Sequence, residues 1–164
     1  MEDYMPTPRA HLLDHAHLQS SLQELSASAT NLNTLSDQLS KQVAEVESAV
    51  NKMGIGLSAS VNTESWSDEL GEEYDTWRLC YAKHQSKWGF TIEHLSGHVA
   101  HEDSHRSETW AFREAPREHR LKAVTKIPEL VDALVQKSKD YAADVSATMS
   151  YAQALAAAFS APKK

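Results

Sequence analysis

The feature that most constrains this chain is a stretch from about Arg9 to Met53 that contains neither glycine nor proline. Every seventh position within it is apolar: Leu18, Leu25, Leu32, Leu39, Val46 and Met53. This heptad spacing is typical of a helix that packs lengthwise against other helices. At 1.5 Å per residue the helix would be about 65 Å long. Gly54 stands where glycine commonly ends a helix, so we expect one long helix over residues 9–53.

The polar face of this helix is unusual because Ser, Thr and Asn dominate it instead of Glu and Lys. These residue types favour helices only weakly, so the isolated helix would be marginally stable. Packing against other helices has to supply the difference. We therefore expect a homo-oligomer, either a dimer or a four-helix arrangement.

The middle of the chain, residues 54–114, changes to alternation of apolar and polar residues, which predicts strands. The alternating runs are 55–61, 77–82, 88–93 and 109–113. An acidic segment from Glu64 to Asp75 and a His-rich segment around residues 94–105 are expected to be loops, and 83–87 a turn. We predict a small antiparallel sheet of three or four strands.

Two prolines divide the C-terminal part, residues 116–160, because proline is tolerated in the first turn of a helix but not in its interior. Pro116 predicts a short helix over Arg117–Lys126, and Pro128 opens a second long helix to about Phe159. The expected fold is a single α+β domain over residues 1–164. Two long antiparallel helices, a coiled-coil-like hairpin, would pack with the short helix on the sheet.

Composition narrows the classes of partner. The chain has 164 residues, a net charge of −7 with histidine neutral, and one cysteine, which excludes an internal disulfide. The negative charge disfavours nonspecific binding to nucleic acid or to an anionic membrane. No apolar stretch approaches the roughly 18 residues of a membrane span. We expect a soluble cytoplasmic protein with neither a nucleic-acid nor a membrane partner.

One segment resembles a metal-binding motif. His101-Glu102-Asp103-Ser104-His105 fits H-E-x-x-H, which on a helix places two imidazoles on one zinc ion with Glu as general base. The charged neighbours, and Gly97 nearby, argue against a helix here. We expect an exposed polar loop without a cofactor, and name His98, His101 and His105 as the zinc ligands if the loop holds a metal.

Among the four tryptophans, Trp66 alone lies outside the alternating apolar positions, so it is the candidate binding residue, with Arg78 and Arg113 as charged neighbours. Phosphate-binding loops and nucleophile motifs are lacking, and Cys80 is expected to be a buried structural thiol. The first hypothesis is a non-catalytic, oligomeric protein-interaction module, so the chain is not expected to be an enzyme. The alternatives are a divalent-metal-binding protein or zinc-dependent hydrolase, and a small-molecule sensor with its ligand between sheet and helices.

Overall fold

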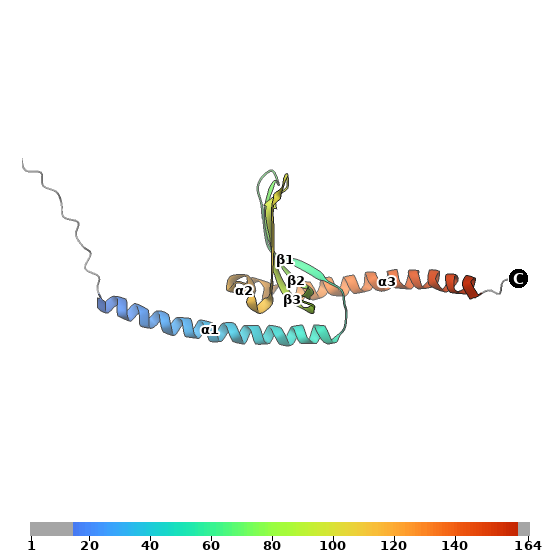
Figure 1. Ribbon diagram of the computed structural model, residues 1–164. Helices are drawn as coiled ribbons and strands as arrows, with labels where there is room; N and C mark the ends of the chain where they lie inside the picture. The colour runs from blue at the N-terminus through green and yellow to red at the C-terminus, as the bar shows by residue number, and fades with distance from the viewer. Residues whose placement is uncertain (1–14, 161–164) are drawn as a thin grey trace, which may run out of the picture. The chain divides into compact units, whose positions relative to one another are not determined.

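The computed structural model describes residues 15–160, and its α+β architecture with a four-stranded antiparallel sheet confirms the coarse fold class, while the expected antiparallel hairpin of the two long helices stays a prediction. The chain divides into two compact units between Leu39 and Ser40. In chain order the elements are α1 (His15–Lys52), β1 (Ala59–Ser67), β2 (Glu73–His84), β3 (Lys87–His98), β4 (His101–Ala111), the 3-10 turn η1 (Phe112–Glu114), α2 (Arg117–Thr125) and α3 (Ile127–Ser160) (Figure 1).

The helix α1 runs without a break from His15 to Lys52, and Gly54, with a φ of +63°, follows it as expected. Residues 9–14 of the predicted helix lie outside the described part of the chain. In the first unit, every residue from His15 to Leu35 is exposed. In the second unit, the last turns of α1 bury Val43 and Val50. The predicted long helix is therefore present, and only its last turns are packed.

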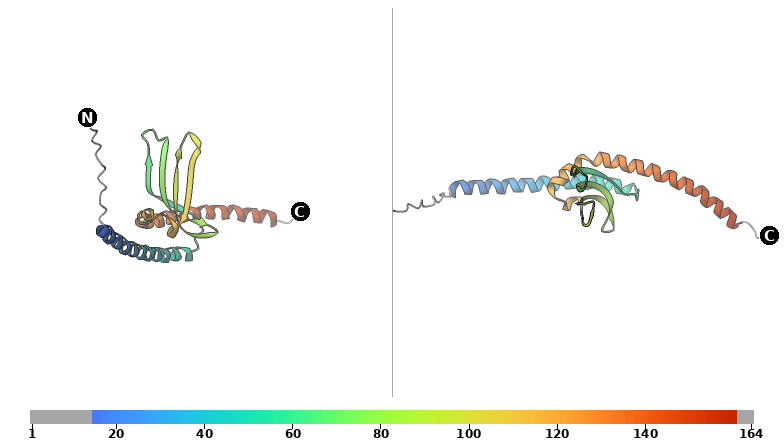
Figure 2. Two further views of the ribbon diagram at one scale, coloured as in Figure 1. Left: turned by 60° about the vertical axis from the view of Figure 1, so that its left-hand side comes forward. Right: turned by 90° about the horizontal axis from the view of Figure 1, so that it is seen from above.

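The sheet has four antiparallel strands in the order β1-β2-β3-β4, so each strand pairs with its neighbour in the sequence (Figure 2). Leu79 of β2 lies opposite Ile92 of β3, which in turn lies opposite Trp110 of β4. The turn between β2 and β3 is tighter than the predicted 83–87. It contains only Gln85 and Ser86, both with positive φ, as two-residue hairpin turns require.

Two predicted boundaries around β1 are wrong. The strand begins at Ala59 instead of residue 55, because Gly56 adopts a φ of +63° that interrupts extended backbone. The acidic segment is not one loop, since β1 continues through Ser67 and β2 begins at Glu73. Asp68 ends the intervening turn by accepting hydrogen bonds from the backbone N–H groups of residues 72 and 73. Backbone hydrogen bonds thus extend β1 and β2 into the acidic segment, although that segment has no alternation of apolar and polar residues.

The predicted His-rich loop is also wrong, because β3 extends to His98 and β4 begins at His101, leaving a two-residue turn. Most of β4 is exposed, so hydrogen bonding to β3 rather than burial of side chains holds it. The last strand ends at Ala111, and Phe112, predicted to be in the strand, belongs to η1.

The hydrophobic core lies in the second unit, between one face of the sheet and the helices. Its fully buried residues include Leu79, Phe90 and Ile92 of the sheet and Leu130 and Leu134 of α3. Burial of such side chains is worth about 1.5–3 kcal/mol each, so this cluster is the main source of stability. Cys80 is also buried, and burial raises the pKa of its thiol to about 11, which keeps it protonated at neutral pH.

The C-terminal helices follow the two prolines as predicted. Pro116 immediately precedes α2, and Pro128 is the second residue of α3, where its missing N–H costs nothing. The packing of α3 on β1 and β2 is confined to its first turns, and every residue from Lys139 to Ser160 is exposed. No helix among residues 15–160 has both the length and the apolar character needed to cross a membrane.

Candidate functional site

A bulge in β1 sets the position of Trp66. The pairing of β1 with β2 shifts between Asn62 and Glu64, so Thr63 is an extra residue in β1. Residues directly opposite in an antiparallel pair share a face. Glu64 lies opposite Trp77, so the bulge brings Glu64, and two residues later Trp66, to the face that carries Trp77. Without the bulge, strict alternation from Val61 would have placed Glu64 and Trp66 on the opposite face of the sheet from Trp77.

Trp77 is the centre of a stack of aromatic rings on this face. Its indole lies parallel to the imidazole of His94, directly opposite on β3, with ring centroids 4.2 Å apart. It also lies parallel to the imidazole of His119 from α2, at 3.3 Å, and to the indole of Trp110, at 5.7 Å. The stack therefore attaches α2 to the sheet.

Carboxylates surround this stack. Glu64 accepts a hydrogen bond of 2.6 Å from the Nζ of Lys122, which also lies 3.1 Å from Glu118. The Oδ2 of Asp75 lies 2.9 Å from the Nε2 of His94. The Nδ1 of His119 is buried and lies 3.1 Å from the Oε2 of Glu64.

These groups line a small, open cavity of about 270 Å³, which we call the Trp66 cavity. Its lining brings together charged and aromatic side chains of β1, β2 and α2, among them Glu64, Trp66, Asp75, Trp77, His119 and Lys122. Trp66 is 56% exposed and makes no ring contact with any described residue. The sequence-based choice of Trp66 therefore falls on an indole beside a cavity, whose ring face is not used by the core.

The pair of Glu64 and Lys122 makes stability pH-dependent. The hydrogen bond from Lys122 lowers the pKa of Glu64 below its ordinary 4.5, while burial opposes this shift. A carboxyl group with a lowered pKa in the folded state stabilises the fold above the pKa it has when unfolded. That contribution is lost as the pH falls from about 4.5 through the folded-state pKa.

We predict that Lys122→Met raises the pKa of Glu64, because it removes the principal group that favours the carboxylate. The stability of the variant should then fall less steeply below pH 4.5 than that of the native chain. A carboxyl-carbon NMR titration and urea unfolding at several pH values measure both effects. Lys126→Met, which removes an exposed pair with Glu129 on the next helix, is the matched control. An unchanged Glu64 titration in Lys122→Met would contradict the assignment.

The structure does not bring Trp66, Arg78 and Arg113 together. Arg78 lies on the opposite face of β2 from Trp77, with its guanidinium 3.9 Å from the carboxylate of Glu93. Arg113 is an exposed residue of η1 and lines a different, larger cavity. Trp66 and the two arginines therefore occupy three separate places in the second unit.

The three candidate zinc ligands also occupy different positions. The rings of His98 and His101 lie 4.6 Å apart beside the turn between β3 and β4. His105 instead faces Tyr74, with its Nδ1 2.9 Å from the tyrosine hydroxyl. On a strand, residues four apart are separated by about 13 Å, so the helical geometry of H-E-x-x-H is not formed. Within residues 15–160, no group of three or more His, Cys, Asp or Glu could hold a metal ion.

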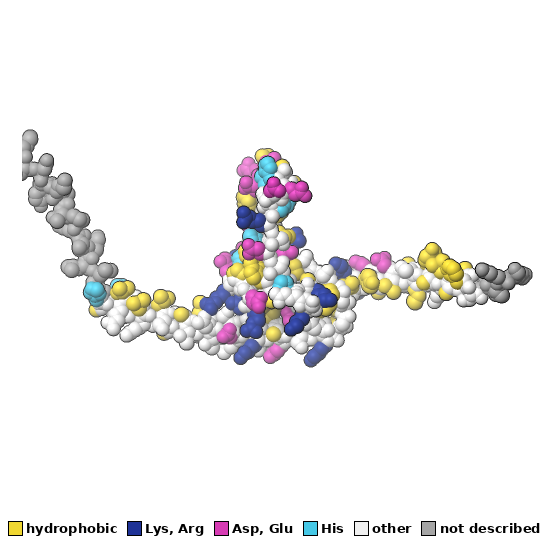
Figure 3. Space-filling model, in the orientation of Figure 1, with side chains coloured by type: hydrophobic (Ala, Val, Ile, Leu, Met, Phe, Trp, Pro, Cys, Tyr) yellow, Lys and Arg dark blue, Asp and Glu magenta, His cyan; other side chains and the backbone are white. Residues whose placement is uncertain are grey.

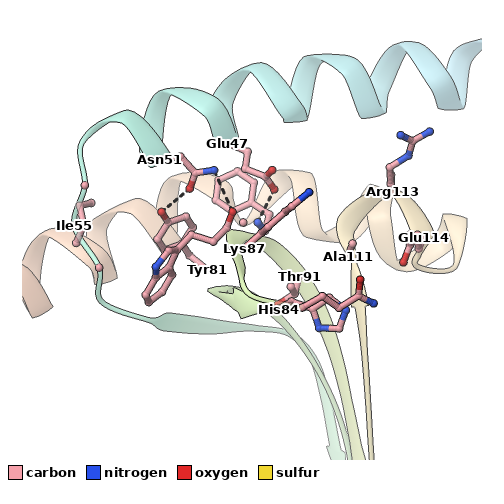
Figure 4. A pocket seen from close by; sticks show the side chains of 16 residues that line it. Glu47, Asn51, Ile55, Tyr81, His84, Lys87, Thr91, Ala111, Arg113 and Glu114 are labelled. Atoms are coloured by element: carbon pink, nitrogen blue, oxygen red, sulfur yellow. Dashed lines mark hydrogen bonds between the residues drawn. The ribbon is translucent and has the colours of Figure 1, made fainter.

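The larger cavity, of about 800 Å³, lies beside the last turns of α1 and the ends of β2 and β3 (Figure 4). Polar side chains that line this cavity are hydrogen-bonded to other parts of the protein. Glu47 accepts a hydrogen bond of 2.6 Å from the backbone N–H of Phe90, and Asn51 accepts one of 2.6 Å from the Tyr81 hydroxyl. A Cβ at Gly89 would lie 2.9 Å from the Glu47 carboxylate, which would have to shift. These bonds attach α1 to the sheet.

Sequence reasoning did not identify the aromatic stack of Trp77 or the pair of Glu64 and Lys122. His94 and Trp77 could have been related through the pairing of two predicted strands, had the register been known. Lys122 lies 58 positions from Glu64, and no local pattern connects the two. No protein-family model matches the chain, and no curated protein or solved structure is significantly similar to it.

Proposed function

We propose that this protein is a non-catalytic interaction module that self-associates through its two long helices. The observation that carries the proposal is an apolar stripe on α1 that is buried near one end of the helix and uncovered near the other. Large uncovered apolar surfaces on a folded chain commonly mark sites of association.

The stripe of α1 follows one face of the helix. Its C-terminal part includes Val43 and Val50, which are buried in the core of the second unit. The same heptad positions and the adjacent ones continue towards the N-terminus as four leucines that are between 45% and 65% exposed: Leu18, Leu22, Leu25 and Leu32. The face that α1 uses to pack on its own core is thus the face that it leaves open farther along.

The helix α3 repeats this arrangement. Leu130 and Leu134 near its start are buried, and the same face continues into exposed Tyr141 and Val145. Further exposed apolar residues follow at Met149, Leu155 and Phe159, the last of them 87% exposed. Figure 3 shows hydrophobic side chains in patches along the end of α3. The abundant alanines of this end would allow a second helix to approach closely.

Charge and helix propensity point to a second copy of this chain as the partner. Residues 15–39 contain only Glu24 and Asp37 as charged groups, and residues 141–160 only Asp144, with histidine neutral. Such faces neither repel one another strongly nor select a highly charged partner. The Ser- and Thr-rich start of α1 also needs packing to remain helical. The sequence predicts antiparallel pairing of the two long helices within one chain, and we propose that the long helices of two chains also pair with one another.

The test is sedimentation of the full chain at micromolar concentrations, where a dimer or larger assembly is expected. Placing glutamates in the stripe, with Leu22→Glu, Leu25→Glu and Leu32→Glu together, should weaken association at least about tenfold, because like charges would be buried against apolar residues. Far-UV circular dichroism should show a loss of helix in the same variant.

The matched control carries three glutamates on the opposite face of the same helix, at Ser20→Glu, Ala27→Glu and Thr34→Glu. This control adds the same charge but leaves the residues of the stripe unchanged, so the variant should associate about as strongly as the native chain. A native chain that sediments as a monomer throughout the micromolar range would refute self-association. Equal weakening in both triple variants would show that net charge, not the stripe, governs it.

A further inference from the structure

We infer that the Trp66 cavity binds an organic ammonium group, such as a quaternary ammonium or the side-chain ammonium of a lysine. This inference concerns the second unit alone and does not depend on self-association. It combines an indole that is more than half exposed and has no ring contact with a described residue, an excess of carboxylates around it, and a cavity of the size of one such group.

The indole of Trp66 is the aromatic surface available to a ligand. Trp77 is already stacked on three rings, whereas Trp66 has no ring partner among the described residues and is more than half exposed. Tryptophan is the side chain that attracts cations most strongly, because of the negative potential over its face. An exposed tryptophan beside a cavity is therefore suited to a cation that also has apolar substituents.

The charges of the lining favour a cation over an anion. Glu64, Asp75 and Glu118 contribute three carboxylates and Lys122 one ammonium, a net charge of −2 with the imidazoles neutral. Lys122 contacts Glu64 and Glu118 but not Asp75, whose Oδ2 lies 2.9 Å from the Nε2 of His94. The side chain of Asp75 is 45% exposed and so remains accessible to a ligand.

The surroundings extend this preference. Between residues 64 and 75 the sequence contains six acidic residues and no basic one. Figure 3 shows acidic side chains gathered at one end of the sheet, where β1 turns into β2 and β3 turns into β4. Such a field raises the local concentration of cations and speeds their association.

The size of the cavity limits the ligands that can enter it. At about 270 Å³ it lies below the usual range for drug-sized ligands, so it fits one functional group with a few carbon atoms. A free small amine and a lysine side chain share this chemistry.

The experiment titrates the full chain with choline at low ionic strength and follows the indole N–H resonances by NMR. Saturable shifts of the Trp66 resonance are expected. The neutral isostere 3,3-dimethylbutan-1-ol, which has carbon in place of the ammonium nitrogen, should bind at least about tenfold more weakly. A capped tripeptide with a central lysine is the second probe. Tighter binding of the peptide would identify a protein side chain as the source, and tighter binding of choline a free amine.

Two variants locate the site. Trp66→Leu should weaken choline binding about tenfold, and Asp75→Asn should weaken it severalfold while retaining a side chain that can contact His94. Glu69→Gln removes a charge from the same acidic segment outside the cavity and should have little effect. Equal affinity for choline and its neutral isostere, or undiminished binding by Trp66→Leu, would overturn the inference. Neither result would bear on sedimentation, so the proposed self-association is tested separately.

Discussion

Replacing Leu130 with alanine should lower the free energy of unfolding of the second unit by about 2–5 kcal/mol. Leu130 of α3 is fully buried in the cluster that also contains Leu79 and Ile92. The substitution removes three carbon atoms from a packed core and leaves a cavity that the neighbouring side chains fill only in part. Urea unfolding followed by tryptophan fluorescence measures the change, since Trp77, Trp88 and Trp110 pack against this core.

Leu121→Ala on α2 is the control for this prediction, because Leu121 is 62% exposed. The same atoms are removed there without forming a cavity, so the free energy of unfolding should change by less than about 1 kcal/mol. A loss of under about 1 kcal/mol for Leu130→Ala would contradict the assignment of Leu130 to the core. The expected loss is a large fraction of the total free energy of unfolding of a domain, which is commonly about 5–15 kcal/mol.

The second large effect is expected at the attachment of α1 to the sheet. Glu47→Ala should lower the free energy of unfolding by about 1–3 kcal/mol, because it leaves the backbone N–H of Phe90 without its hydrogen-bond acceptor. Hydrogen exchange of the Phe90 amide should accelerate more than expected from the change in global stability. Native-state exchange resolves this amide from its neighbours on β3.

Glu47→Gln tests whether the lost acceptor is the cause. Its amide oxygen can still accept the bond from Phe90, so most of the stability and the slow exchange should return. Similar destabilisation in Glu47→Gln and Glu47→Ala would instead indicate that the negative charge of Glu47 is decisive.

The helices were predictable because their signals are local. Gly54 ends α1, and the two prolines at 116 and 128 mark the starts of α2 and α3 within one or two residues. The central strands were predictable for a similar reason. Leu79 and Tyr81 of β2 and Phe90 and Ile92 of β3 belong to one core cluster, and residues two apart share a face of a strand, so the apolar residues alternate in the sequence.

The ends of the sheet were not predictable in this way. In β4 the sequence His101–Ala111 is almost entirely polar, and most of its side chains are exposed. A strand without a buried face carries no alternation, so only its hydrogen bonds to β3 reveal it. The bulge at Thr63 was equally hidden, since an extra residue moves the rest of the strand to the other face without changing composition.

For the candidate site, the sequence by itself determined that Trp66 stands apart from the other tryptophans and lies among acidic residues. Its periodicity also determined the long apolar stripe of α1. Only the tertiary structure decided that Trp66 borders a cavity with Trp77, His119 and Lys122, and that the start of the stripe remains uncovered. Spacing along the chain encodes helix and strand faces, because these depend on near neighbours. The cavity joins β1, β2 and α2, and the contacts between them depend on how the chain folds back on itself.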